Sequence, residues 1–275
     1  MFVCLIMEFR TIVDIQKADF EIPPFERMLF VGSCFSEYIG KRFQEEKFKA
    51  TVNPFGVMYN PASILHTIER CEEAPCVAVF TLGTNHVYRF KETGEIVDNC
   101  KKLPPWLFQE EELTVDQCVE YLSQAVDTLL QRYAEARVIV TVSPIRYAKY
   151  GFHGSQLSKS TLLLATDQLV KKYAGRVVYF PAYEIVNDEL RDYRFYKEDM
   201  LHPSDQAVKY IWQRFGDMFF GEDVRTFLKE WRPIKEALKH RPFRPKGEGY
   251  IEFIQKTKER AALLSEKYGF DLLEE

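Results

Sequence analysis

The sequence lacks the excess of positive charge that nucleic-acid-binding chains usually carry. Its 275 residues hold 37 Lys and Arg against 41 Asp and Glu, a formal net charge of −4 at pH 7. Because affinity for phosphate backbones comes mainly from cationic side chains, this balance argues against nucleic acid as a partner. With 46% hydrophobic residues, the chain is long enough to bury the core of one large domain, with or without a small appendage.

Paired cysteines, glycine-rich phosphate loops and long apolar runs are also missing. None of the six cysteines forms a C-x-x-C pair, so the sequence predicts no zinc-type metal site. It contains neither G-x-G-x-x-G nor G-x-x-x-x-G-K-[ST] after its first apolar run, which argues against a nucleotide cofactor. No window approaches the roughly 18 apolar residues of a membrane span. Scattered thiols and the lack of a signal-peptide pattern at the start predict a cytoplasmic protein.

What the sequence does contain is a regular alternation of short β-rich runs and longer segments of helical period. This pattern predicts an α/β fold with a parallel sheet wound with helices. Further helices are predicted over 115–130, from about Ser158, from Pro203, and as a pair within 221–275, while 8–24 is expected to be extended, as a candidate edge hairpin. The five runs expected to form strands are 28–31, 48–52, 77–82, 137–142 and 176–180.

Polar residues cluster just after these strands. In an open parallel sheet, ligands gather at the carboxyl ends of the strands, so side chains distant in sequence can converge there. The residues in such positions, or in the last crossing loop, are Ser33, Cys34, Asn53, Gly56, Asn85, His86, Ser143, Arg146, Asp199 and His202.

The stretch MLFVGSCFS at 28–36 places two candidate nucleophiles, Ser33 and Cys34, at a strand-to-helix turn. Acyl transfer needs a nucleophile at such a turn, a base, a group that orients the base, and donors for the oxyanion. His202 is the candidate base, and Asp199, three residues earlier, can accept its Nδ1 proton.

Two further residues are candidates for the oxyanion hole. The side-chain amide of Asn85 and the backbone N–H of Gly56 each follow a predicted strand, and either could donate to a developing oxyanion. The nucleophile's own N–H is a third candidate donor.

Four blocks in this order resemble those of the SGNH or GDSL-like hydrolases: GSCFS at 32–36, NPFG at 53–56, GTNH at 83–86 and DMLHPS at 199–204. More narrowly, GSCFS followed by NPFGVMYNP is similar to the GSCFA-domain family of that clan. The resemblance covers about 8–220 and implies a flavodoxin-like, three-layer α/β/α fold with a five-stranded parallel sheet. We expect the chain to divide into a domain at 1–220 and a helical extension at 221–275 packed on it.

The resemblance also implies an activity. Members of the wider clan are esterases or acyltransferases that use neither metal nor cofactor, often on acylated sugars or lipids. The expected partner is therefore a small-molecule or glycan acyl ester, handled by a Ser33–His202–Asp199 triad. A non-catalytic glycan- or acyl-binding module on the same scaffold is the alternative.

The register of the first block leaves the nucleophile open. The clan's usual turn is Gly-Asp-Ser, whereas here Ser33 directly follows Gly32 and Cys34 occupies the usual serine position. Ser33 is the first candidate and Cys34 the second, and Ser33 could instead be a helix N-cap with no catalytic role.

Three residues are candidates for substrate binding, each with a plainer interpretation. Asn53 is also a good turn residue, His86 could be a packing histidine, and Arg146 could either bind an anionic group or lie in a solvated loop.

Overall fold

The computed structural model describes residues 9–98, 100, 102–242 and 247–273. Most of the N-terminal segment that lacks a signal-peptide pattern, residues 1–8, lies outside this range. Within the described residues, no helix has the length and apolar character needed to cross a bilayer.

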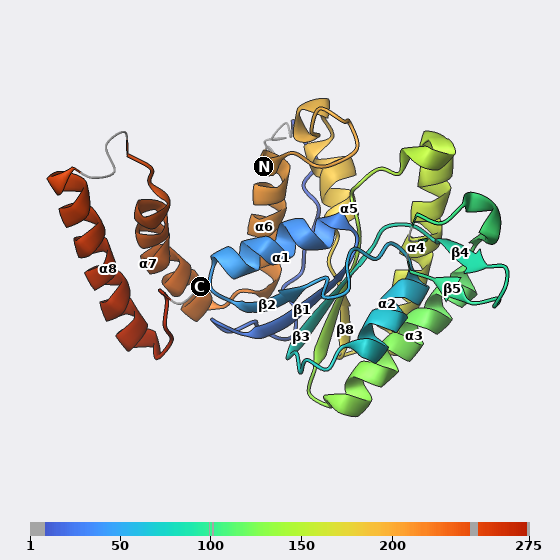
Figure 1. The fold of residues 1–275 in the computed structure, drawn as a ribbon, viewed down its shortest axis with the longest axis horizontal. Coiled ribbons are helices and arrows are strands. Elements are labelled where there is room, and N and C mark those ends of the chain that lie inside the picture. The colour runs from blue at the N-terminus through green and yellow to red at the C-terminus, as the bar shows by residue number, and fades with distance from the viewer. Residues whose placement is uncertain (1–8, 99, 101, 243–246, 274–275) are drawn as a thin grey trace, which may run out of the picture.

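A five-stranded sheet forms the centre of the molecule, and all its strands are parallel (Figure 1). Its strand order is β2-β1-β3-β7-β8. When only these five strands are numbered along the chain, this is the 2-1-3-4-5 order of flavodoxin-like folds. The predicted five-stranded parallel sheet is therefore confirmed. The strands are β1 (Arg27–Gly32), β2 (Lys49–Val52), β3 (Val77–Leu82), β7 (Arg137–Val142) and β8 (Val177–Tyr179).

Helices cover both faces of this sheet and complete three layers (Figure 1). Side chains alternate along each strand, so Leu29 and Val31 of β1 enter one core while Met28 and Phe30 enter the other. The first core is closed by α2 (Pro61–Arg70), α3 (Val115–Arg132) and α4 (Gly151–Lys172), and the second by α1 (Cys34–Glu45), α5 (Ala182–Glu184), the π-helix η3 (Ile185–Leu190) and α6 (Asp205–Phe219).

A second, antiparallel sheet of order β5-β4-β6 lies between β3 and α3 in the chain, and the sequence analysis did not predict it. Its strands are β4 (His86–Phe90), β5 (Ile96–Val97) and β6 (Phe108–Glu112). The sequence of β6 is FQEEE, and glutamate is disfavoured in strands, so pairing with β4 overrides local preference. Three short 3-10 helices complete the connections: η1 (Pro105–Leu107), η2 (Ala148–Tyr150) and η4 (Tyr193–Phe195).

One expected element and two expected helix starts were wrong. Residues 9–26 form no hairpin; instead, the N–H groups of Ala18 and Ile22 bond to carbonyls at the end of α6. Helix α4 begins at Gly151, seven residues before Ser158. Helix α6 begins at Asp205 because Ser204, rather than Pro203, precedes the helix as its N-cap.

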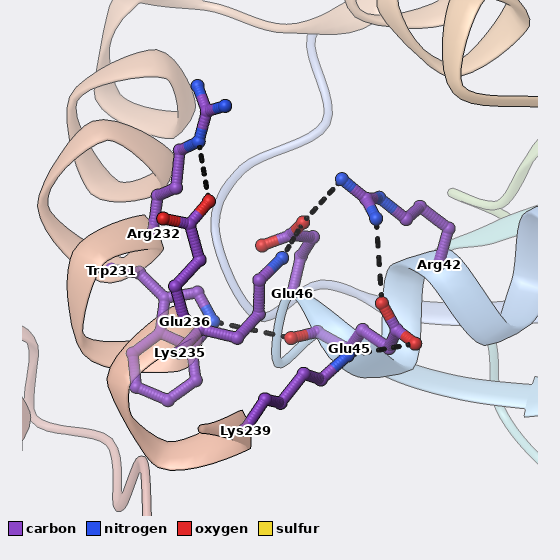
Figure 2. A network of polar contacts seen from close by, with 8 residues as sticks. All are labelled: Arg42, Glu45, Glu46, Trp231, Arg232, Lys235, Glu236 and Lys239. Carbon is purple, nitrogen blue, oxygen red and sulfur yellow. Dashed lines mark hydrogen bonds and ion pairs between the residues drawn. The ribbon is translucent and has the colours of Figure 1, made fainter. Parts of the chain in front are cut away.

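The two predicted C-terminal helices are present as α7 (Glu222–Lys239) and α8 (Glu248–Tyr268). Helix α7 lies toward the end of α1, and α8 packs on the far side of α7 (Figure 1). Figure 2 shows the polar contacts between α7 and that end of α1. Trp231 Nε1 donates to the Glu45 carbonyl at 3.2 Å, and Lys235 forms an ion pair with Glu46. Both side chains of that ion pair are largely buried, so α7 is attached to the sheet-bearing part through a desolvated contact as well as an apolar one.

Candidate functional site

Gly32 makes the turn from β1 into α1 possible. Its φ is +140°, and a Cβ there would lie 2.1 Å from the Thr81 carbonyl oxygen, so a side chain cannot be accommodated. The Gly32 N–H donates to Asn53 Oδ1 at 2.9 Å, and the Ser33 N–H donates to the Thr81 carbonyl at 3.0 Å. The turn is therefore fixed from both neighbouring strands, β2 and β3.

The turn places the two candidate nucleophiles in different environments. Ser33 is 2% exposed and is the N-cap of α1: its Oγ accepts the Phe35 N–H at 3.3 Å and lies 3.3 Å from Thr81 Oγ1. Cys34 is the first residue of α1 and is half-buried, and its Sγ lies 3.9 Å from the hydroxyl of Tyr59. Ser33 is therefore the N-cap of α1, while its catalytic role stays a prediction.

The predicted base and its orienting carboxylate are hydrogen-bonded. His202 Nδ1 lies 2.5 Å from Asp199 Oδ2, while Asp199 Oδ1 accepts the backbone N–H groups of His202 and Leu201 at 2.9 and 2.8 Å. These two backbone donors, followed by the imidazole, lower the pKa of Asp199 to about 2. A carboxylate on Nδ1 leaves Nε2 as the nitrogen free to act on a ligand.

One pocket brings these groups together. It has a volume of about 290 Å³ and lies at the carboxyl ends of β1, β3 and β7, as expected for this sheet type. A larger hollow of about 760 Å³ lies at the amino ends of β1 and β2 and is lined by neither the candidate nucleophiles nor His202. The described lining of the smaller pocket is Ser33, Cys34, Tyr59, Gly83, Ser143, Ile145, Arg146, Tyr147, Ala148, Lys149, Leu201 and His202.

The two predicted oxyanion donors are engaged elsewhere and do not line this pocket. The Gly56 N–H donates to the Asn53 carbonyl at 2.9 Å, within the turn after β2. Asn85 is buried, and its Nδ2 donates to the Leu113 carbonyl at 2.8 Å, which ties the loop after β3 to the residue that follows β6. By its position, the Cys34 N–H has no acceptor within α1.

Of the three candidate substrate-binding residues, Arg146 lines the pocket. Its guanidinium lies 4.2 Å from the ring centre of Phe152, and Nη1 donates to the Met200 carbonyl at 3.2 Å. Asn53 holds the Gly32 turn instead, and His86 stacks on Tyr150 with ring centres 3.7 Å apart. Burial lowers the pKa of His86, consistent with a packed, neutral imidazole.

Lys159 on α4 is a polar residue near this site that the sequence analysis missed. It is 2% exposed, and its Nζ donates to the carbonyl of Gly83, which lines the pocket, at 2.6 Å. The signal in the sequence is positional: Ser155, Lys159 and Leu162 follow one another at helical spacing, and all three are buried in α4. Among the described residues, no three His, Cys, Asp or Glu side chains are arranged to hold a metal ion.

Comparison with protein families identifies the class to which this arrangement belongs. The family model described as "GSCFA family" matches residues 27–76 and 71–215, and the model described as "GSCFA domain protein, C-terminal domain" matches 231–275. The chain therefore belongs to the GSCFA family. A comparison with curated protein sequences finds no match.

Solved structures are similar at low identity. A carbohydrate esterase family 3 protein from Talaromyces cellulolyticus is 10% identical, with 74% of this chain and 99% of that chain covered and a TM-score of 0.40. A family two carbohydrate esterase from Clostridium thermocellum, in complex with cellohexaose, is 11% identical, with 77% and 66% covered and a TM-score of 0.43.

Proposed function

We propose that this chain transfers the acyl group of a small ester to water or to an alcohol, using protein side chains as its catalytic groups. The observation that carries the proposal is the Asp199–His202 hydrogen bond at the wall of a pocket that Ser33 and Cys34 also line. A nucleophile, a histidine and an orienting carboxylate at one strand-end pocket are the parts that acyl transfer through a covalent intermediate requires.

In the proposed reaction, the nucleophile attacks the ester carbonyl and its proton passes to His202 Nε2. Asp199 holds the imidazole in the tautomer that can accept this proton and stabilises the resulting positive charge. We assign the oxyanion to the Cys34 N–H, the first of helix α1, where the helix dipole also favours negative charge. His202 then protonates the leaving alcohol. Water or another alcohol next attacks the acyl intermediate and gives its proton to His202, which returns the proton to the nucleophile as the acyl group is released.

Two observations support Cys34 over Ser33 as the nucleophile. The Cys34 side chain reaches the pocket half-buried, whereas the Ser33 residue is 2% exposed and its oxygen already accepts an N–H of α1. A thiol is also intrinsically more nucleophilic than a hydroxyl. The cap bond of Ser33 is long, at 3.3 Å, so a rotation of its side chain would break it at small cost, and Ser33 is the second candidate.

The size and lining of the pocket support a small substrate. A volume of about 290 Å³ is at the lower end for ligand sites and suits an acyl group with part of one sugar ring. Tyr59 and Tyr147, whose ring centres lie 6.4 Å apart, supply aromatic surface of the kind on which sugars stack. We therefore propose an acylated sugar or a similar ester as the substrate.

The test is the hydrolysis of p-nitrophenyl acetate and of an acetylated monosaccharide by the wild type and three alanine variants. We expect Cys34→Ala to lower kcat/KM by about 10²-fold or more. Ser33→Ala should lower the free energy of unfolding by about 1 kcal/mol through loss of the cap, with a smaller effect on rate. Cys76→Ala is the matched control, since Cys76 is partly exposed and lies just before β3, far from the strand carboxyl ends.

The reverse pattern, with activity lost in Ser33→Ala and kept in Cys34→Ala, would assign the nucleophile to Ser33. Equal activity in all four proteins would rule out both nucleophiles. A non-catalytic binding module is the competing hypothesis, and it is favoured by the engagement of Gly56 and Asn85 away from the pocket. That hypothesis expects saturable binding of the acetylated sugar with no turnover.

A further inference from the structure

Lys159 is a buried cation that the proposed reaction does not use. Its pKa is lowered to about 7, and burial is the sole cause, so no charged neighbour compensates for it. Its Nζ donates to the Gly83 carbonyl at 2.6 Å, and no described carboxylate forms an ion pair with it. An apolar side chain would cost less to bury at this position, so the amine is expected to have a role beyond filling space.

The acceptor of this hydrogen bond connects Lys159 to the candidate nucleophiles. Gly83 lines the pocket, and its N–H donates to the Tyr59 carbonyl at 2.8 Å. A Cβ on Gly83 would lie 3.0 Å from the Tyr59 carbonyl oxygen and 3.4 Å from the Ser33 Cβ. Gly83 thus packs closely against both Tyr59 and Ser33, and Lys159 holds its carbonyl.

The residue before Lys159 holds the rest of the same loop. Ser158 Oγ lies 3.0 Å from Thr84 Oγ1 and accepts the Asn85 N–H at 3.0 Å. Two consecutive residues of α4 therefore hold the loop 83–85 in place at the end of β3. We call these hydrogen bonds to the loop 83–85 the clamp. A clamp needs only hydrogen-bonding groups. Ser158 supplies them without charge, whereas Lys159 adds a cation at the Gly83 carbonyl.

We propose that Lys159 is a positioning residue for the reaction proposed above, on which this inference rests. Its amine fixes the Gly83 carbonyl, and with it the pocket wall against Ser33 and Tyr59. Its ammonium form also places a positive charge at the carbonyl of a pocket-lining residue, and this charge would favour the negative charge that develops on the nucleophile and the oxyanion.

The charge is present in one pH range and absent in another. Because the pKa of Lys159 is about 7, the ammonium form predominates below neutrality and is lost as the pH rises through 7. An effect of the charge should therefore be largest in mildly acidic solution, whereas an effect of the clamp alone should not depend on pH. Lys159 is not itself in the described lining of the pocket; the titratable side chains that line it are Cys34, Tyr59, Arg146, Tyr147, Lys149 and His202.

The test compares the wild type with Lys159→Met and Ser158→Ala by two measurements. The first is kcat and KM for p-nitrophenyl acetate between pH 5.5 and 9. The second is the rate at which iodoacetamide alkylates Cys34, followed by mass spectrometry of the peptide that contains it. Because alkylation is read at Cys34 itself, it reports an effect of Lys159 on the pocket even if no ester is hydrolysed. Lys171→Met is the control, since Lys171 is an exposed lysine of the same helix.

For Lys159→Met we expect kcat to fall about tenfold at pH 6, with KM changed less than about twofold. Alkylation of Cys34 should slow about fivefold at pH 6 and be unchanged at pH 9, where Lys159 is neutral in the wild type. Ser158→Ala should lower kcat without changing the pH dependence of alkylation, and it tests the clamp even if Lys159→Met does not fold.

Two outcomes separate the inference from the function on which it rests. If the wild type hydrolyses the ester and Lys159→Met matches it in both measurements at every pH, the role of Lys159 is wrong. If the wild type hydrolyses no ester but alkylation of Cys34 still depends on Lys159 at pH 6, the charge acts on the pocket and the proposed reaction is wrong.

Discussion

Among single residues, Asp199 has the clearest expected effect. Its carboxylate holds His202 Nδ1, and its pKa of about 2 means that it stays ionised over the whole range in which the protein would be assayed. Asp199→Asn should therefore lower kcat on the order of 10²-fold or more at all pH values above about 4, because an amide cannot stabilise the imidazolium. Steady-state kinetics measure this, with the exposed neighbour variant Glu198→Gln as the control.

The pH dependence of stability gives an independent check on Asp199. A carboxylate whose pKa is lower in the folded state than in the unfolded chain contributes stability above pH 4, and that contribution is lost as the pH falls from about 4 to 2. Urea midpoints of the wild type and Asp199→Asn should converge over this acidic interval. Midpoints that remain equally far apart from pH 6 to pH 2 would contradict the assigned pKa.

The sequence could indicate the hydrogen-bonded pair because Asp199 and His202 belong to one local turn, where spacing determines contact. It could not fix the partners of Asn85, because the Leu113 carbonyl that its amide bonds is 28 residues away and lies just after a strand that no pattern revealed. The burial of Lys159 was not predicted for a related reason. Lysines on helices are normally exposed, and this one is buried because it contacts the Gly83 carbonyl at the end of β3.

At the scale of elements, branched and aromatic runs bounded by polar turns were sufficient to predict the five parallel strands. The central strands β3 and β7 are almost fully buried by helices on both faces and so have a continuous apolar signal. The antiparallel sheet was not predictable in this way. Strand β5 has two residues and β6 is rich in glutamate, so their pairing with β4 comes from tertiary context.

The junction of α1 with α7 supports a prediction about stability. Lys235 and Glu46 form an ion pair in which both side chains are largely buried, and burial is the main reason that the pKa of Lys235 is lowered (Figure 2). Glu46→Gln leaves the Lys235 ammonium buried without its carboxylate and should reduce the free energy of unfolding by about 3 kcal/mol. Lys235→Met should cost less, because Arg42 still pairs with Glu46 at 3.4 Å. The double variant should lose clearly less than the sum of the two.

A matched pair on the same helix provides the control for this cycle. Arg232 and Glu236 form an exposed i,i+4 ion pair, and its double variant should change the free energy of unfolding by less than about 0.5 kcal/mol. Urea unfolding measures all of these values. Equal, additive losses in the two cycles would mean that the Lys235–Glu46 contact is no more important than a surface pair.

For the molecule as a whole, the remaining prediction concerns the division into 1–220 and 221–275. Phe25, from the segment before β1, stacks on Phe270 with ring centres 4.2 Å apart, and it also packs edge-on against Phe227 at 4.7 Å. Removing 221–275 exposes this aromatic contact and the buried Glu46. We therefore expect 1–220 to unfold at a clearly lower urea concentration, and the full chain to unfold in one cooperative transition.

Function should follow a different pattern from stability. The described lining of the strand-end pocket runs from Ser33 to His202 and includes no residue of the extension, so 1–220 should retain the ester-hydrolysing activity at temperatures at which it is folded. Phe270→Ala in the full chain tests the same contact without truncation and should lower the urea midpoint while leaving kcat unchanged. Two separate unfolding transitions, with the midpoint of 1–220 unchanged by removal of 221–275, would instead mean that the C-terminal helices are an independent unit.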